Sequence, residues 1–391
     1  MLERSEPFFW VETANLTHVD SMECSICFEE EVFIFYTLFH LLSLLNLACK
    51  MGEENTIYYM IFQNVMRGIT GTSNEIIGTA YMNTGFTNPD KNCYMNAVLQ
   101  IMMNTGNFVN YYETSAIRNH IDINNNNGSK GGLSGAFSAL ANCYKSEKYS
   151  VLNLQPFIKF MAEHIDANLN GHVAIDSCEF QRMFIQFLSE DVNTVSNPIA
   201  VNRKYPANDI IVYSNDYFAQ MRAYSSSIIK NIFSNVFIYR FSCIPCNISW
   251  IVFIESCFLS IFLPKTEEHP RFADCLSFIF NQEHERDNCI CENCNSKLVV
   301  SEKIWKLPEI VIIKLDRPKA ENKDIRNVNL VESFNFAEYF HERSEFNRTS
   351  YNLYAMVIHI GTLDDAHFVA VLKDKKKFNR WFLYNDEKRE K

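Results

Sequence analysis

The spacing of hydrophobic residues divides the chain into a helical part and a later β-rich part. Apolar residues recur at helical intervals in VLQIMMN at 98–104 and in EFQRMFIQFLSE at 179–190, which predicts two helices. After Ile228, segments rich in β-branched and aromatic residues predict strands at 234–243, 248–263, 310–315, 351–360, 367–373 and 380–385. Because the predicted helices precede the predicted strands, the order favours an α+β protein.

The first 75 residues differ from the rest of the chain, which becomes enzyme-like from about Thr79. Residues 32–49 form an uncharged apolar stretch of 18 residues, the lower limit for a membrane span. Lys50 follows it and would leave the C-terminal part in the cytosol. His40 and Asn46 are costly within lipid unless paired, so the sequence favours a packed helix over a membrane span. The role of residues 1–75 is otherwise unknown.

The composition indicates a globular protein without a nucleic-acid-binding surface. The chain has 391 residues, of which 47% are hydrophobic, enough for two or three domains or one enzyme domain with insertions. The 36 basic against 46 acidic residues give a net charge of −10, which provides no basic field for nucleic acid. Thirteen cysteines, an odd number, without a cleavable leader indicate a reducing compartment. We therefore expect a cytoplasmic or nuclear protein, with a membrane anchor facing the cytosol as the alternative.

The cysteines occur partly as CxxC pairs. The pair Cys24 and Cys27 lacks a second pair nearby, whereas two later pairs supply four thiolates from two tight turns: Cys243 with Cys246, and Cys291 with Cys294. Four thiolates suit tetrahedral Zn²⁺, so we predict a structural zinc site. Cys289 lies close enough to compete with Cys291, and buried or free thiols are the alternative interpretation.

A different cysteine lies in FTNPDKNCYMNAVLQIMMN, residues 86–104, where a polar run meets the start of a predicted helix. A helix N-terminus favours the thiolate form through its unpaired N–H groups and its dipole, so Cys93 is a candidate nucleophile. Asn88, Asn92 and Asn96 flank it with hydrogen-bond donors, and Asn88 could aim its amide at an oxyanion. On spacing alone, a buried structural thiol is the alternative.

The C-terminal end supplies a candidate base. His367 opens one predicted strand, and Asn385 and Asp386 close the next. An antiparallel pair joined by the lysine-rich turn at 373–379 would place the end of the second strand beside the start of the first. His367 could then meet Asn385 or Asp386 as a base with its orienting acceptor. A solvated histidine beside a polar strand end is the alternative.

Four segments together resemble the ubiquitin-specific proteases, the family of ubiquitin carboxyl-terminal hydrolases. In chain order, GFTNPDKNCYMNAVLQ is similar to the family's cysteine box, IDSCEFQRMFIQFL to its Q-D-A-x-E-F helix and LPEIVIIKLDRP to its L-P-x-x-L-x-x-x-L-K-R-F strand. AHFVAVLK followed by WFLYNDEK is similar to its histidine box. Four boxes in the right order are far more specific than any single one.

The resemblance implies a papain-like α+β fold with thumb, palm and fingers. It implies a catalytic domain over 79–389 with zinc-binding fingers at about 230–305, and it implies that ubiquitin or its conjugates are the partner. Thiol-dependent cleavage after the last glycine of ubiquitin would be the activity. The matched positions give Cys93 as nucleophile, His367 as base, Asn385 as third triad member followed by Asp386, Asn88 as oxyanion stabiliser, and Asp176 and Glu179 as contacts for the arginines of the ubiquitin tail.

The sequence also departs from the family pattern. Asp90 and Ala366 replace glycines, Asn92 replaces threonine, Phe368 replaces tyrosine and Pro318 replaces phenylalanine. None of these changes removes a reacting group. A carboxylate three residues before the nucleophile disfavours its thiolate, and lost glycines restrict a loop that must accept substrate. A catalytically silent ubiquitin-binding scaffold on the same fold is therefore the alternative function.

Overall fold

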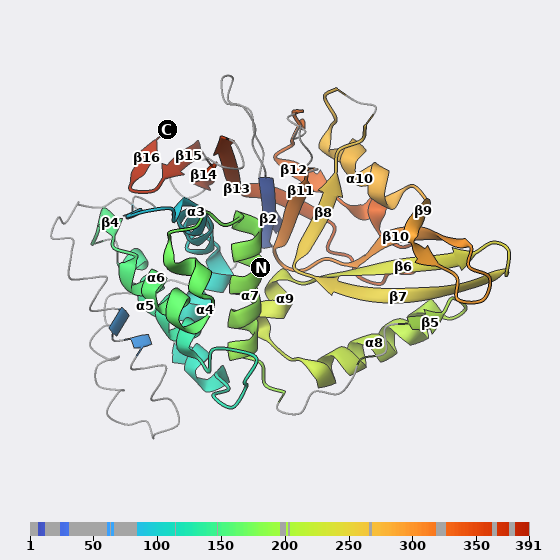
Figure 1. Ribbon diagram of the computed structural model, residues 1–391, viewed down its shortest axis with the longest axis horizontal. Coiled ribbons are helices and arrows are strands. Elements are labelled where there is room, and N and C mark those ends of the chain that lie inside the picture. The colour runs from blue at the N-terminus through green and yellow to red at the C-terminus, as the bar shows by residue number, and fades with distance from the viewer. Residues whose placement is uncertain are drawn as a thin grey trace, which may run out of the picture.

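A computed structural model describes most of the chain beyond residue 83. The described residues are 7–11, 24–30, 61–62, 64–65, 84–113, 115–146, 148–195, 201, 204–265, 268–317, 326–361, 366–374 and 380–390. The apolar stretch at 32–49 lies outside these ranges. Among the helices described, none combines the length and the hydropathy that a membrane crossing needs. Figure 1 shows a helical thumb at the left, a central palm sheet and a fingers extension at the right.

The thumb contains the predicted helices. Residues 98–104 fall in and just beyond α3 (Cys93–Met102), and residues 179–190 fall in α7 (Ser177–Asp191), so both predictions are confirmed. The other thumb helices are α4 (Gly106–Glu113), α5 (Gly132–Lys145) and α6 (Gln155–His164), with short 3₁₀ turns at Ser115–His120 and Ala167–Asn170. A small parallel pair, β3 (Gly85–Phe86) and β4 (Val151–Leu152), ties the loop before α3 to the thumb.

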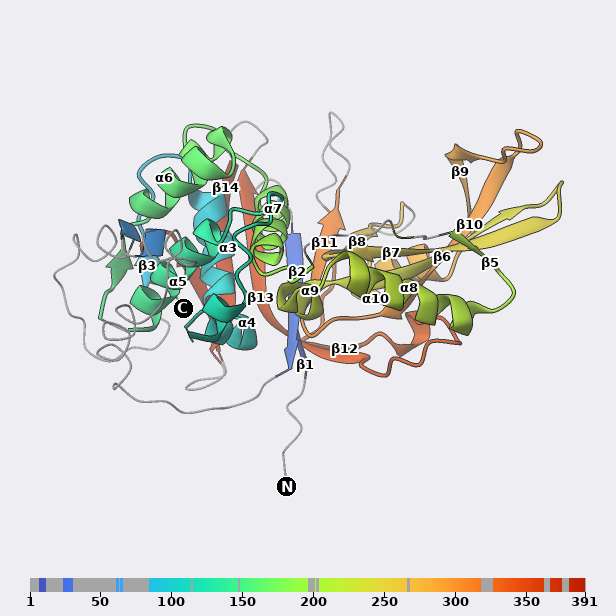
Figure 2. The same ribbon diagram turned by 90° about the horizontal axis from the view of Figure 1, so that it is seen from below.

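The palm is one long sheet within the described residues. Its order is β16-β15-β14-β13-β2-β1-β11-β8, and β12 pairs with β13. The strands are β16 (Lys388–Glu390), β15 (Arg380–Asn385), β14 (Ala366–Asp374), β13 (Ser350–Gly361), β2 (Cys24–Glu30), β1 (Pro7–Val11), β11 (Val311–Asp316), β8 (Phe258–Phe262) and β12 (Ser333–Asn335). As predicted, β14 and β15 are antiparallel. Two strands from the first 75 residues thus lie between β13 and β11, as Figures 1 and 2 show.

The fingers are a second sheet in the order β5-β7-β6-β10-β9. Its strands are β5 (Lys204–Pro206), β7 (Ile248–Ser256), β6 (Asn235–Cys243), β10 (Lys297–Lys306) and β9 (His284–Ile290). Helix α8 (Ile210–Tyr224) packs on one face, where Tyr217 lies against Phe253 with ring centroids 5.1 Å apart. The short helix α9 (Ile228–Phe233) leads from α8 into β6.

After residue 228, the structure differs from the sequence prediction in two ways. The predicted strand at 248–263 is interrupted at Cys257, so that β7 belongs to the fingers and β8 to the palm. Helix α10 (Phe272–Phe280) lies within the part where only strands were predicted. Its aromatic residues are typical of strands. However, the Asp274 carboxylate accepts the backbone N–H of Arg271 at 2.8 Å, and this half of a capping box stabilises the start of a helix.

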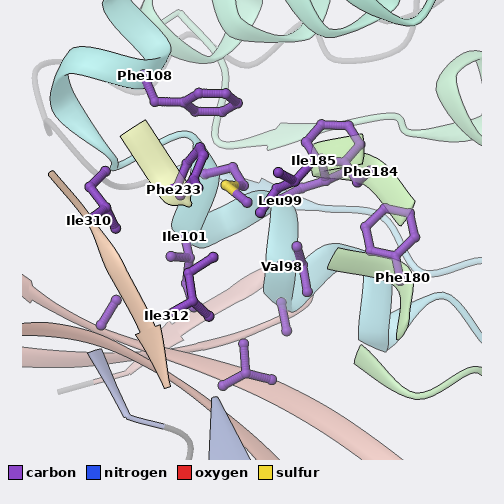
Figure 3. Close-up of a cluster of buried hydrophobic side chains, with 14 of the residues drawn as sticks. Val98, Leu99, Ile101, Phe108, Phe180, Phe184, Ile185, Phe233, Ile310 and Ile312 are labelled. Atoms are coloured by element: carbon purple, nitrogen blue, oxygen red, sulfur yellow. The ribbon is translucent and has the colours of Figure 1, made fainter. Parts of the chain in front are cut away.

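Helix α3 lies at the junction of thumb and palm. All ten of its residues are buried, which is typical of a core helix rather than a surface one. In Figure 3, Val98, Leu99 and Ile101 point into a cluster formed with Phe180 and Phe184 of α7, with Ile312 of β11 on the palm side. Because interiors are close-packed, this cluster fixes the position of the helix and of Cys93 at its first turn.

Candidate active site and metal centre

Cys93 is the first residue of α3, as the sequence predicted, and only 5% of it is exposed. The loop before it is held on both sides. The Asn92 N–H donates to Asn88 Oδ1 at 3.0 Å, and the Lys91 N–H donates to the Gly171 carbonyl at 2.8 Å. The N–H groups of the first turn have no partner within the helix and carry its positive dipole end. A helix N-terminus of this kind favours negative charge beside it.

His367 lies in β14, between Cys93 and Asn385. Its Nε2 and Asn385 Oδ1 are 2.8 Å apart, so Nε2 carries the hydrogen and Nδ1 is left for the cysteine. The hydrogen bond with Cys93 raises the pKa of His367 to about 9, and the hydrogen bond with Asn385 acts in the same direction although burial opposes both. The two strands therefore bring His367 and Asn385 together in the way their sequence positions predicted.

Asp386 is the next residue, but its carboxylate has other partners. Its Oδ2 accepts from Asn88 Nδ2 at 2.9 Å, and its Oδ1 accepts from Asn96 Nδ2 at 2.8 Å. The backbone of Asp386 is left-handed, with φ of 51°, at the turn between β15 and β16. Adjacent residues thus have separate contacts, since Asn385 binds His367 and Asp386 binds the two asparagines.

The acidic residues Asp176 and Glu179 lie at the start of α7, and this helix packs against α3. Tyr94 of α3 packs edge-on against Phe180 of α7, with ring centroids 5.6 Å apart, so the first turns of the two helices are in contact. Asp176 is the N-cap of α7, and its Oδ1 accepts the backbone N–H of Cys178 at 2.9 Å. Glu179 is exposed and forms a salt bridge with Arg182 one turn later.

The departure at Asp90 has a local explanation. Asp90 is not among the described residues with positive φ, so the position does not require the glycine that the family pattern has. Its Oδ2 lies 2.7 Å from Nδ1 of His172, and both side chains are well exposed. The carboxylate therefore has solvent and a histidine as neighbours.

The four predicted metal ligands form one cluster at the tip of the fingers. The Sγ atoms of Cys243, Cys246, Cys291 and Cys294 all lie within 4.8 Å of one another. Cys243 and Cys294 are 3.4 Å apart, and Cys246 and Cys291 are 3.9 Å apart. Tetrahedral zinc with Zn–S bonds of about 2.3 Å separates its sulfurs by about 3.8 Å, so the four thiols fit this ion. Cys289 packs nearby without being a member of the cluster.

The two CxxC turns share a left-handed residue directly after the second cysteine. Asn247 and Asn295 each follow the second cysteine of a pair and have positive φ, 51° and 58°. The Asn295 N–H donates to the Cys291 carbonyl at 2.9 Å, and the Asn247 N–H donates to the Ile244 carbonyl at 3.2 Å. Asparagine tolerates this left-handed conformation better than most residues, so both turns can point their cysteines inward.

Comparison with known families now decides the class of protein. A family model described as ubiquitin carboxyl-terminal hydrolase matches residues 84–391. The chain belongs to this family. The resemblance drawn from the four sequence boxes is thereby confirmed, as is the papain-like α+β fold of the ubiquitin carboxyl-terminal hydrolases.

Named relatives are distant and longer. The chain is 22% identical over 356 residues to ubiquitin carboxyl-terminal hydrolase 4 of Eremothecium gossypii, covering 81% of this chain and 41% of the relative. It is 23% identical over 341 residues to ubiquitin carboxyl-terminal hydrolase 4 of Saccharomyces cerevisiae strain S288c, covering 78% of this chain and 36% of that relative. The chain thus spans about two fifths of the length of these ubiquitin carboxyl-terminal hydrolases.

Solved structures agree on the fold. A SAGA DUB module of Ubp8, Sgf11, Sus1 and Sgf73 bound to monoubiquitin matches with a TM-score of 0.54 and 16% identity, over 88% of this chain and 73% of that one. The same module bound to ubiquitin aldehyde matches with a TM-score of 0.54 and 17% identity, over 80% of this chain and 67% of that one.

Several contacts of the candidate site were not predicted from the sequence. The pairing of Asp90 with His172 joins loops 82 residues apart, and no local pattern indicates it. Asn96 was noted only as a flanking donor. Its position three residues after Cys93, on the same face of the helix, was a usable signal that its side chain points toward the site.

Proposed function

We propose that this chain is a cysteine-type deubiquitinase that hydrolyses the bond after the C-terminal glycine of ubiquitin. The main support is the set of contacts around His367, which shares hydrogen bonds with Cys93 and with Asn385. A nucleophile, a base and an orienting acceptor in series are what covalent acyl transfer requires. Family membership supports the same substrate class.

In the proposed reaction, His367 takes the proton of Cys93, and the thiolate attacks the carbonyl carbon of the last glycine. Asn88 Nδ2 carries two hydrogens, of which one binds Asp386, and the other stabilises the oxyanion together with the backbone N–H groups at the start of α3. His367 then returns the proton to the leaving amine, and a thioester remains. Water, deprotonated by His367, attacks the thioester and releases the ubiquitin carboxylate and the Cys93 thiol.

The pH dependence follows from the raised pKa of His367. The imidazolium persists up to about pH 9, well above its usual 6.5, so the thiolate and imidazolium pair should survive to that pH and be lost above it. We expect kcat/KM for a fluorogenic ubiquitin C-terminal amide to fall above about pH 9. Asn385→Ala removes an acceptor that favours the imidazolium, so the basic limb should move to lower pH. A limb that stays in place or moves upward in this variant would contradict the role of Asn385.

Asp176 and Glu179 are proposed to receive the arginines of the ubiquitin tail. Glu179 must first exchange Arg182 for a tail arginine, and an exposed pair of this kind is worth only about 0.2–1 kcal/mol, so the exchange costs little. We expect Glu179→Ala to raise KM for a ubiquitin substrate several-fold with kcat nearly unchanged. Glu163→Ala, which removes an exposed acid paired with Lys159 on α6, is the matched control. An equal rise in KM in both variants would refute a specific tail contact.

A structural Zn²⁺ is proposed at the four-cysteine cluster. Cys243, Cys246, Cys291 and Cys294 would hold it, and the ion would join the β6–β7 turn to the β9–β10 turn. The β6–β7 and β9–β10 turns lie at the end of the fingers, far from α3 in Figure 1, so we assign the ion no step in the reaction.

The reduced thiols and the ubiquitin substrate favour the cytoplasm or the nucleus as the location. The stretch at 32–49 keeps a membrane anchor facing the cytosol as the less favoured alternative.

The deciding experiment is capture by ubiquitin that carries a C-terminal electrophile. A deubiquitinase should form a covalent adduct at Cys93 and should also hydrolyse the fluorogenic ubiquitin amide. A catalytically silent scaffold would bind ubiquitin reversibly without either reaction. Reversible binding alone would therefore overturn the proposal in favour of the scaffold.

A further inference from the structure

We propose that Asn96 is a positioning residue that acts through the Asp386 carboxylate to hold the Asn88 carboxamide beside Cys93. The inference rests on the proposed function, because it concerns the donor that stabilises the oxyanion. It adds a residue to which neither the sequence boxes nor the family match assigns a role. Three segments take part: the loop before α3, the α3 helix and the turn between β15 and β16.

The contacts form a continuous chain of hydrogen bonds. Asn96 is 3% exposed, and its Nδ2 donates to Asp386 Oδ1 at 2.8 Å and to the Thr87 carbonyl at 3.2 Å. Asp386 Oδ2 accepts from Asn88 Nδ2 at 2.9 Å. Asn96 therefore binds both the residue before Asn88 and the carboxylate that binds the Asn88 side chain.

The Asn88 carboxamide is held at both ends by this arrangement. Its oxygen accepts the Asn92 N–H at 3.0 Å, and one hydrogen of its nitrogen is donated to Asp386. The remaining hydrogen of Nδ2 then has a fixed direction. A donor fixed before the reaction stabilises an oxyanion more than one that must reorient during it.

The turn that carries Asp386 lies directly against the loop that carries Asn88. The Phe86 N–H donates to the Asp386 carbonyl at 3.0 Å. A Cβ atom at Gly85 would lie 2.6 Å from the Glu387 carbonyl oxygen and 2.7 Å from that of Asp386, closer than atoms can approach. Only glycine fits there, so the backbone brings the carboxylate within reach of both asparagines.

The burial of Asn96 supports a role as donor rather than as filler. Its Oδ1 is buried and has no hydrogen-bond partner in the part of the chain that the structure describes. A buried carboxamide with an unsatisfied oxygen costs free energy that an apolar residue of similar size would avoid. Its two donated hydrogen bonds, one of them to a charged carboxylate, are what an apolar residue could not supply.

The first test is a double-mutant cycle on kcat with a fluorogenic ubiquitin amide. Asn96→Ala should lower kcat about 10²-fold, the cost of a donor misplaced by about 1 Å, with KM changed less than about twofold. Asn96→Leu, which has a similar size but no donors, should lose as much. If Asn96 acts through Asn88, the double variant with both asparagines replaced by alanine should have the same kcat as Asn88→Ala alone. Losses that multiply would overturn the proposal.

A matched control separates positioning from general stability. Asn104 follows α3, and its Nδ2 donates to the Gln100 carbonyl at 2.7 Å and to the Tyr144 hydroxyl at 2.9 Å, away from Asp386. Asn104→Ala removes a comparable carboxamide and should keep kcat. Alkylation of Cys93 by iodoacetamide displaces iodide and forms no oxyanion, so its rate should be equal in Asn96→Ala and the unaltered protein. A slower alkylation that matches the loss of kcat would show displacement of Cys93 itself, and would overturn the proposal.

An NMR measurement that needs no catalysis tests the role of Asn96 independently of the proposed function. In protein labelled with ¹⁵N-asparagine, the side-chain NH₂ signal of Asn88 can be assigned by its loss in Asn88→Ala. In Asn96→Ala this signal should shift and exchange faster with water, whereas Asn104→Ala should leave it unchanged. An unchanged Asn88 signal in Asn96→Ala would overturn the positioning role. Absence of ubiquitin hydrolysis by the unaltered protein would overturn the proposed function, and the Asn88 signal would still decide the role of Asn96.

Discussion

Cys93→Ala is expected to abolish hydrolysis of a fluorogenic ubiquitin C-terminal amide, with kcat reduced by about 10⁶-fold, because no other group can form the thioester. The variant should also lose capture by the ubiquitin electrophile. It should still bind ubiquitin, since the tail contacts proposed for Asp176 and Glu179 do not involve the thiol. Hydrolysis that persists in this variant would refute the assignment of Cys93 as nucleophile.

The companion variants show whether the site acts as a unit. His367→Ala should cost nearly as much as Cys93→Ala, and the double variant no more than either, because nucleophile and base serve one step. Cys143→Ala is a suitable control, since this thiol is buried in α5 and burial raises its pKa to about 12. It removes a sulfur from the same subdomain without touching the reaction. Loss of activity in the control would show that the assay reports on folding rather than on chemistry.

The contact between His367 and Asn385 was predictable because it follows from local rules. Side chains alternate along a strand, and residues that are diagonal to each other on one face of an antiparallel pair lie within reach of long side chains. Cys93 was predictable for a similar reason, because a polar turn before an apolar helical pattern marks a helix start. The four thiols of the metal cluster were predictable from their spacing in two CxxC pairs.

The partners of Asp386 were not predictable in the same way. The sequence suggested that Asp386 could orient His367, and its side chain instead contacts Asn88 and Asn96, at sequence separations of 298 and 290 residues. The left-handed backbone at Asp386 turns the side chain toward α3, and no local pattern at a strand end fixes this direction.

The sheet to which some strands belong could not be predicted from the sequence, because it depends on tertiary structure. The stretch 248–263 reads as one strand, but a break at Cys257 directs its halves into different sheets. Residues 7–11 and 24–30 show no strong alternation, and their backbones nevertheless join the palm. In both cases the pairing partner decides the structure, and strand propensity depends on that context. The domain limits at 79–389 stay a prediction.

Zinc removal is the second large effect that we expect. Freshly purified protein should contain one zinc per chain, and Cys243→Ser or Cys291→Ser should lose it. In structural sites of this kind, metal binding contributes about 10–16 kcal/mol to folding, as apparent values for zinc-finger peptides indicate. Here only the fingers turns depend on the ion directly, so we expect a markedly lower melting temperature and fast proteolysis between β6 and β10. Metal analysis and limited proteolysis with and without a chelator measure both effects.

Two controls make the zinc prediction specific to the four ligands. By its sequence position, Cys289 could replace Cys291 as a zinc ligand, but its thiol lies outside the four-cysteine cluster. Cys289→Ser should therefore keep its zinc. Cys93→Ala should also keep its zinc, because the nucleophile belongs to a different subdomain. Zinc retained in Cys291→Ser but lost in Cys289→Ser would reassign the fourth ligand, whereas folded protein without zinc would reject the site altogether. Neither result would affect the assignment of Cys93, since the two sites share no residue and the hydrogen bonds of His367 and Asn385 do not involve the fingers.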